Sequence, residues 1–252
     1  MKLLIKLSYL GSEFCGYQVQ NGKRTVQGEL TEAAKALFTY DCDITGCSRT
    51  DSGVHANMFC ATISKKGESG LTTRLTPDRI VLALNAHLPD DIHVYDAQWV
   101  DDDFHARYNV KYKEYIYRIC TGGQDVPFMR SRAMMYYKRL DDKAIENMQR
   151  AAEKYVGEHD FCAFMAQGSK IVSTVRCVKY ANVQRVGDEI IFTVAADGFL
   201  YNMVRIMVGT LIAVGEGKIK AEDIENIILS CDRKNAGQTA PADGLYLNRV
   251  VY

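Results

Sequence analysis

Hydrophobic and polar residues alternate along residues 2–10, and this period of two predicts a β-strand. From Thr25 to Phe38 the hydrophobic residues recur every three or four positions, which predicts a helix with Thr25 as its N-cap. The elements predicted next are a strand at 43–48, a strand at 57–65, a helix at 76–88 and a strand at 92–100. The first part of the chain therefore has the predicted order β-α-β-β-α-β.

The rest of the chain repeats a similar order of elements. The predicted elements are a strand at 111–120, a helix at 141–155, strands at 171–184 and 188–197, and helices at 200–214 and 221–230. Units of this kind build antiparallel sheets with helices packed on one face, and two of them can join into one long sheet. We therefore predict an α+β protein of two β-α-β-β-α-β-like halves, residues 1–104 and 105–252.

The composition narrows the class of protein. The chain has 252 residues, of which 47% are hydrophobic and 25% charged, as expected of a soluble globular protein. It starts with strand-like alternation and shows no long apolar segment or cleavage site, so we expect a cytoplasmic protein without a membrane span. Its eight cysteines form no Cys-x-x-Cys pair and have no histidine at ligand spacing. Free thiols in a reducing compartment are expected, with no metal site.

Charge is distributed unevenly along the chain. The net charge is zero, although proteins that bind RNA usually carry excess positive charge. Residues 105–139, however, hold eight Lys or Arg residues against two acidic ones, with Tyr and Phe interleaved. This mixture is typical of a nucleic-acid surface, and it makes Arg107, Arg130 and Arg132 candidate RNA-binding residues. A solvated basic face with buried tyrosines is the alternative.

The stretch from Gly46 to Ala56 concentrates chemically active side chains between two predicted strands. Arg49, Asp51 and His55 supply a guanidinium, a carboxylate and an imidazole within seven residues. A rigid scaffold on both sides can present such a loop to a substrate. The alternative is an ordinary turn in which Asp51 bonds its own backbone and a glycine has a positive φ. For the imidazoles of His55 and His105 we expect structural hydrogen bonds rather than catalysis.

The helix predicted around residues 199–214 carries one charge, Arg205, near its centre. Its residues are apolar nearly all round, so it is expected to be buried in the protein. It is too short to span a bilayer. Because a buried guanidinium without a partner is costly, Arg205 is expected to pair with a carboxylate.

Several motifs, taken together in their order, resemble those of a known family, the bacterial tRNA pseudouridine synthase A family. The motifs are Arg-Thr-Asp-Ser-Gly-Val-His-Ala at 49–56, Phe-His-Ala-Arg at 104–107, Lys-Glu-Tyr-Ile-Tyr at 113–117, Gly-Phe-Leu-Tyr-Asn-Met-Val-Arg at 198–205 and Ala-Pro-Ala-Asp-Gly-Leu-Tyr-Leu at 240–247. The resemblance covers nearly the full chain. Departures from the family pattern occur at Leu10, Tyr17, Cys47, Ser48 and Ser52.

The resemblance implies an activity and a fold. The family isomerises uridine to pseudouridine in the anticodon stem-loop of tRNA, at positions 38, 39 and 40, without a cofactor. It implies a homodimer that binds tRNA and neither DNA nor a membrane. It also implies the pseudouridine synthase fold, in which the two halves form one long sheet with a central cleft.

The resemblance also assigns roles to individual residues. Asp51 is implied as the catalytic carboxylate, which is paired with Arg205 and acts on the ribose as a nucleophile or, alternatively, as a base. Leu245 is implied as a residue that lines the uracil pocket. Tyr115 is implied as a catalytic residue that stacks on the target uracil and assists proton removal, although a tyrosine on a strand is more often a packing residue. Because the uridine must leave its stack, a basic side chain such as Arg49 is a candidate to occupy the gap.

Two other functions remain open at this point. One is the same chemistry at another RNA position, because the motif near the N-terminus departs from the family pattern. The other is an RNA-binding module that has kept the fold without catalysis. The combination of Asp51, Tyr115 and Arg205 argues against a binding module, because binding alone needs no buried acid with a paired base.

Overall fold

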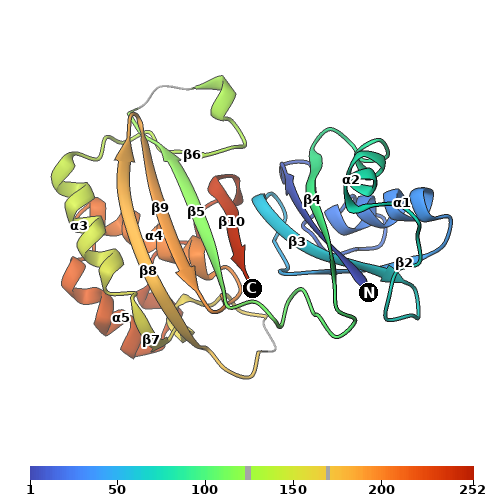
Figure 1. Ribbon diagram of the computed structural model, residues 1–252. Helices are drawn as coiled ribbons and strands as arrows, with labels where there is room; N and C mark the ends of the chain where they lie inside the picture. The colour runs from blue at the N-terminus through green and yellow to red at the C-terminus, as the bar shows by residue number, and fades with distance from the viewer. Residues whose placement is uncertain (123–125, 169–170) are drawn as a thin grey trace. The chain divides into compact units, whose positions relative to one another are not determined.

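A computed structural model describes residues 1–122, 126–168 and 171–252 (Figure 1). Contacts between residues divide the chain into two compact units. The first unit comprises residues 1–111 and 246–252, and the second comprises residues 112–245. Each unit combines helices with a sheet in which most strand pairs are antiparallel. The predicted α+β class with mainly antiparallel pairing is confirmed.

The first unit is built on a central strand, β3. Its elements are β1 (Lys2–Tyr9), α1 (Val26–Phe38), β2 (Cys42–Gly46), β3 (His55–Lys65), α2 (Pro77–Asn85), β4 (Ile92–Val100) and most of β10 (Leu245–Val251). The strand order is β4-β1-β3-β10, and β2 pairs with the C-terminal part of β3. Only the short β10–β3 ladder is parallel among the described pairs of this unit. The predicted β-α-β-β-α-β order of residues 1–104 is confirmed.

Helix α1 forms where its sequence pattern predicts. The side chain of Thr25 accepts a hydrogen bond from the backbone N–H of Gly28 at 3.2 Å, which caps the first turn. Val26, Leu30 and Ala33 are buried on the face toward the sheet, as expected from their spacing. The helix ends at Thr39, which has a left-handed conformation with φ of 61°.

The second unit has the strand order β5-β9-β8-β7, with β6 beside β5. Its strands are β5 (Tyr112–Cys120), β6 (Met134–Met135), β7 (Gly157–Asp160), β8 (Val175–Val186) and β9 (Glu189–Ala196). Its α-helices are α3 (Asp142–Glu153), α4 (Met203–Gly215) and α5 (Ile224–Ser230). Helix α3 packs against β8 and α4, and its Met148 and Ala152 are buried. None of the helices described in the two units is long and apolar enough to cross a membrane.

The units differ from the predicted halves at both ends. The first unit extends past residue 104 to Lys111. It also includes residues 246–252, because Tyr246 and Leu247 pair with His55 and Ala56 of β3. Strands β7 and β10 were not predicted. A single sheet through both halves and a cleft between them stay predictions.

Helix α4 begins later than its sequence predicts. The first helical residue is Met203, because Asn202 is left-handed with φ of 59° and cannot continue a helix. Arg205 therefore lies in the first turn of α4 and not near its centre. The prediction of a buried helix is confirmed, since nine of its thirteen residues are buried.

Candidate functional site

Asp51 lies in a tight turn between β2 and β3. The backbone N–H of Val54 donates to the carbonyl of Asp51 at 3.2 Å, and Gly53 has φ of 82°, the geometry of a turn that requires glycine at its third position. Asp51 is half-buried, whereas Arg49 is exposed. The turn conformation predicted as the alternative is therefore present. It does not exclude a functional role, because the turn presents the carboxylate at the surface of a rigid unit.

The end of β1 and the segment after it form hydrogen bonds with Thr50, the residue before Asp51. The hydroxyl groups of Tyr9 and Thr50 are hydrogen-bonded at 2.8 Å, and the backbone N–H of Tyr17 donates to the carbonyl of Thr50 at 3.1 Å. Gly16 makes this approach possible, because a Cβ at this position would lie 2.8 Å from the same carbonyl. Thr50 is therefore fixed by both its side chain and its main chain, and the direction of Asp51 is constrained with it.

The residues after Asp51 are held by the same segment. The hydroxyl of Ser52 donates to the carbonyl of Phe14 at 3.1 Å, and the backbone N–H of Gly53 donates to it at 3.3 Å. A Cβ on Gly11 would lie only 2.0 Å from the carbonyl oxygen of Val54. Backbone thus packs on backbone along the whole turn, which leaves little freedom for the loop that carries Asp51.

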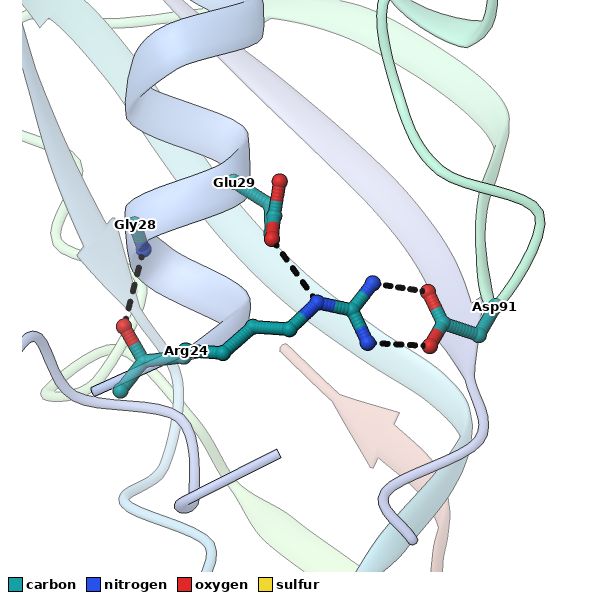
Figure 2. Close-up of polar contacts among 5 residues, drawn as sticks. Arg24, Gly28, Glu29 and Asp91 are labelled. Atoms are coloured by element: carbon teal, nitrogen blue, oxygen red, sulfur yellow. Dashed lines mark hydrogen bonds and ion pairs between the residues drawn. The ribbon is translucent and has the colours of Figure 1, made fainter. Parts of the chain in front are cut away.

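The guanidinium of Arg24 binds two acidic residues (Figure 2) and contacts the ring of Phe14, and we call this network the brace. The guanidinium makes a two-pronged hydrogen bond with Asp91 at 2.8 and 2.9 Å and a third bond with Glu29 at 3.0 Å. It also lies over the ring of Phe14, 4.2 Å from its centre. Because Phe14 is the residue that accepts from Ser52, the brace continues into the turn. The sequence did not predict this network, since Arg24 and Asp91 are far apart in the chain.

The two histidines have structural roles, as expected. The ring nitrogen Nδ1 of His55 accepts from the backbone N–H of Gly11 at 2.9 Å, and the fully buried ring stacks on Tyr246 at 4.5 Å. Nδ1 of His105 accepts from the backbone N–H of Arg107 at 3.1 Å. Burial lowers the pKa of His105, so its ring is neutral at physiological pH.

Tyr17 and Cys47, two residues at which the sequence departs from the family pattern, lie in the core of the first unit. Tyr17 stacks on Phe59 with ring centres 4.4 Å apart, and its ring lies against Gly46. Its hydroxyl is buried and, within the described residues, has no hydrogen-bond partner. Burial also raises the pKa of Tyr17 well above its ordinary value. Cys47 is buried beside Cys60, whose carbonyl accepts from its backbone N–H at 2.8 Å. Both side chains are buried, and the sulfur of Cys47 also accepts a hydrogen bond from the backbone N–H of Cys60 at 3.4 Å.

In the second unit, Tyr115 projects from β5 on the same face as Tyr117. Tyr115 is 7% exposed and meets the ring of Phe199 edge-on, with the ring centres 5.0 Å apart and an angle of 82° between the planes. Burial alternates along this part of β5, because Ile116 and Arg118 are less buried than Tyr115 and Tyr117. Whether the ring of Tyr115 stacks on uracil stays a prediction.

Arg205 is bound to the segment that carries the last motif. Its Nε donates to the carbonyl of Ala240 at 2.7 Å, and a terminal nitrogen donates to the side-chain oxygen of Asn202 at 2.8 Å. In return the backbone N–H of Ala240 donates to the carbonyl of Arg205 at 3.1 Å. Neutral acceptors therefore position the guanidinium within its own unit. Its predicted pairing with Asp51, a residue of the other unit, stays a prediction.

The segment after residue 236 packs tightly on α4. A Cβ on Gly209 would lie 1.7 Å from the carbonyl oxygen of Gln238, so the helix needs glycine there. The hydroxyl of Tyr117 donates to the carbonyl of Pro241 at 2.7 Å, which joins this segment to β5. The motifs at 113–117 and 198–205 and residues 240–245 of the last motif thus meet in the second unit. Leu245 is buried at the start of β10.

The basic stretch 105–139 is shared between the units. Arg107 belongs to the first unit, while the exposed Arg130 and Arg132 belong to the second. Arg118 is ion-paired with Glu189 at 2.8 Å, and Lys138 is ion-paired with Glu216. The exposed bases Arg130, Arg132 and Arg139 and the exposed rings of Phe128 and Tyr137 lie within residues 126–139, which we call the basic segment. Residues 123–125 lie outside the described part of the chain.

Comparison with known proteins agrees with the motifs. The family model described as tRNA pseudouridine synthase matches residues 7–109 and 151–252. Proteins named tRNA pseudouridine synthase A from Acetivibrio thermocellus, Halalkalibacterium halodurans and Clostridium botulinum are 44%, 42% and 42% identical to this chain. The alignments cover 100%, 97% and 100% of this chain and 99%, 90% and 99% of these relatives. The chain therefore belongs to the tRNA pseudouridine synthase family.

Proposed function

We propose that this protein isomerises uridine to pseudouridine in the anticodon stem-loop of tRNA, at positions 38, 39 and 40. The observation that carries the proposal is the turn around Asp51. In a chain of this family, a half-buried carboxylate stands on a turn whose neighbours are bonded on both sides. Such support suits a carboxylate that must meet a reacting atom at a fixed distance.

The reaction defines what the carboxylate must do. The bond between ribose C1′ and N1 of uracil breaks, the base turns, and C1′ joins C5, which then loses its hydrogen. The step involves no net oxidation and no energy input. Asp51 acts in its ionised form on the ribose, as a nucleophile that holds C1′ while the base turns. Pairing with Arg205 is proposed to keep this carboxylate ionised.

The other site residues are assigned to binding. Tyr115 presents an aromatic ring for the uracil, and the apolar side chain of Leu245 lines the pocket around it. Arg49 is exposed two residues before Asp51, so its side chain is placed to contact the phosphate backbone or to fill the gap left by the flipped base. Arg107, Arg130 and Arg132 supply charge for the tRNA backbone.

The proposed assembly is a cytoplasmic homodimer that binds tRNA. Light scattering on the purified protein tests whether it is a dimer. The proposal predicts a mass twice that of one chain at micromolar concentration. A single-chain mass with full activity would contradict a requirement for the dimer.

Mapping pseudouridine in tRNA tests the proposed function. Bulk tRNA from a strain that lacks this gene is compared with tRNA from the parent strain and with the same tRNA after incubation with purified protein. The proposal predicts that pseudouridine at positions 38–40 disappears in the first sample and returns in the last. Restoration at other positions only would identify the same chemistry at another site. No restoration would favour a binding module.

A further inference from the structure

Three potential metal ligands converge in the second unit, away from the motifs described above. Asp160 ends β7, Cys162 begins the short 3-10 helix at Cys162–Phe164, and Cys231 follows α5. A carboxylate oxygen and the two sulfur atoms all lie within 4.8 Å of one another. Cys231 and Asp160 are exposed and Cys162 is half-buried, so water and ions can reach all three.

The backbone holds this cluster in place. The backbone N–H of Cys162 donates to Oδ1 of Asp160 at 3.0 Å, which fixes the carboxylate beside the first thiol. Cys231 is left-handed with φ of 48°, a conformation that usually belongs to glycine or asparagine at the end of a helix. A cysteine there is strained, and residues held in such conformations often mark functional positions.

We propose that Asp160, Cys162 and Cys231 bind a thiophilic divalent cation of the Zn²⁺ class. Two thiolates and one carboxylate are ligands that Zn²⁺ accepts, and three protein ligands leave a fourth position for water. With Zn–S distances of about 2.3 Å, a tetrahedral site places its sulfur atoms roughly 3.8 Å apart. The ligand atoms of the cluster, all within 4.8 Å of one another, have separations of this order.

The carboxylate distinguishes a cation site from a disulfide. A disulfide would use only the two sulfur atoms and would leave the negatively charged Asp160 beside a neutral bridge. A bound cation uses all three groups and offsets their mutual repulsion. Binding would also tie the end of α5 to β7, elements far apart in the sequence, and so stabilise the second unit. Cysteine spacing does not indicate the site, because its two cysteines lie in distant segments.

Cadmium binding tests the site, because thiolate coordination to Cd²⁺ absorbs in the ultraviolet. The full-length protein, kept reduced with a phosphine, is titrated with Cd²⁺ and then with Zn²⁺ as a competitor. We expect one equivalent of cation, an absorption band that Zn²⁺ removes, and a higher melting temperature with either metal. Loss of an outer-shell partner already weakens metal binding by about 10–100-fold, so Cys231→Ser and Cys162→Ser are each expected to weaken it by at least about 100-fold.

Matched variants separate the cluster from other thiols. Cys15→Ser removes a half-buried thiol of the first unit and should leave the titration unchanged. Asp160→Asn keeps an acceptor for the backbone of Cys162 and should weaken binding while the absorption band remains. Equal binding by the parent and Cys231→Ser would overturn the proposal. It would also be overturned if thiol counting before reduction showed Cys162 and Cys231 already joined.

Discussion

The two units position their functional side chains in different ways. In the first unit Asp51 stands on a loop, and its place depends on hydrogen bonds from the segment after β1 and on the brace from Arg24. In the second unit Tyr115 and Arg205 stand on a strand and a helix, so regular backbone bonds place them. A loop can hold a reactive group rigidly only when a neighbouring segment replaces the missing ladder of hydrogen bonds.

The units share one device, the close approach of two backbones at a glycine. Gly11 lets the segment after β1 approach Val54, and Gly209 lets residues 236–240 approach α4. A glycine inside a helix costs about 1 kcal/mol relative to alanine, so Gly209 must gain more from this close packing than it loses.

The largest expected loss of stability comes from adding a side-chain Cβ at either of these glycines. Gly209→Ala places a Cβ 1.7 Å from the carbonyl oxygen of Gln238, and Gly11→Ala places one 2.0 Å from that of Val54. Backbone cannot yield as a side chain does, so each change should reduce the free energy of unfolding by at least about 3 kcal/mol. Gly198→Ala is the control, because its Cβ would meet only the flexible side chain of Arg176. Urea unfolding measures all three, and equal stabilities would refute the close packing.

Removing the brace with Arg24→Met should reduce stability less than these glycine changes, and it should lower turnover. Charge-assisted hydrogen bonds contribute about 1.5–3 kcal/mol, but Arg24 is 37% exposed, so Arg24→Met should cost only about 1 kcal/mol. Because Phe14 then loses its support, kcat should fall while KM for tRNA stays near the parent value. Arg79→Met, on the exposed face of α2, is the matched control. If Arg24→Met has the kcat of the parent, the turn around Asp51 keeps its conformation without the brace.

Replacing two buried tyrosines with phenylalanine is expected to change the free energy of unfolding in opposite directions. The hydroxyl of Tyr17 has no hydrogen-bond partner among the described residues, so Tyr17→Phe should raise the free energy of unfolding by about 1 kcal/mol. The hydroxyl of Tyr117 donates to Pro241, so Tyr117→Phe should lower it by about 1 kcal/mol. Thermal unfolding of both variants checks the signs. A decrease in both would mean that the hydroxyl of Tyr17 contributes to the first unit.

The smallest expected effect concerns the basic segment. Replacing Arg130 and Arg132 with Gln should flatten the dependence of tRNA affinity on salt, by about 0.7–0.9 in logarithmic slope for each phosphate that is no longer neutralised. The control replaces Arg150, in the last turn of α3, and Lys154, just after this helix, whose charges are paired with Glu222 and Glu225. Binding measured between low and moderate salt compares the two. If the slope of the Arg130 and Arg132 variant matches that of the parent, the basic segment is only a solvated surface.

Local patterns were sufficient to predict much of the fold. The alternation of β1 and the cap at Thr25 were visible because strand and helix periods depend on neighbouring residues. The start of α4 was predicted too early, since a left-handed Asn202 leaves no mark in hydrophobic spacing. Strand β7 is four mostly polar residues, and such a sequence resembles a loop.

Long-range contacts could not be predicted in this way. The return of β10 to the first unit depends on its pairing with β3, and the brace depends on Arg24 meeting Asp91. Neither interaction has a local signal. The motifs identified Asp51, Tyr115 and Arg205 as candidates, but the hydrogen bonds that fix the turn around Asp51 became visible only in the structure.

The release of tritium from tRNA labelled at uridine C5 tests the role of Asp51 most directly, because joining C1′ to C5 expels that hydrogen. Asp51→Asn keeps the size and the hydrogen-bonding oxygen of a turn residue but removes the charge. We expect a folded protein that binds tRNA and releases no tritium above background. Asp90→Asn, at an exposed turn of the same unit, should retain parent activity. Tritium release by Asp51→Asn at a rate close to the parent's would contradict the assignment of Asp51 as the catalytic carboxylate.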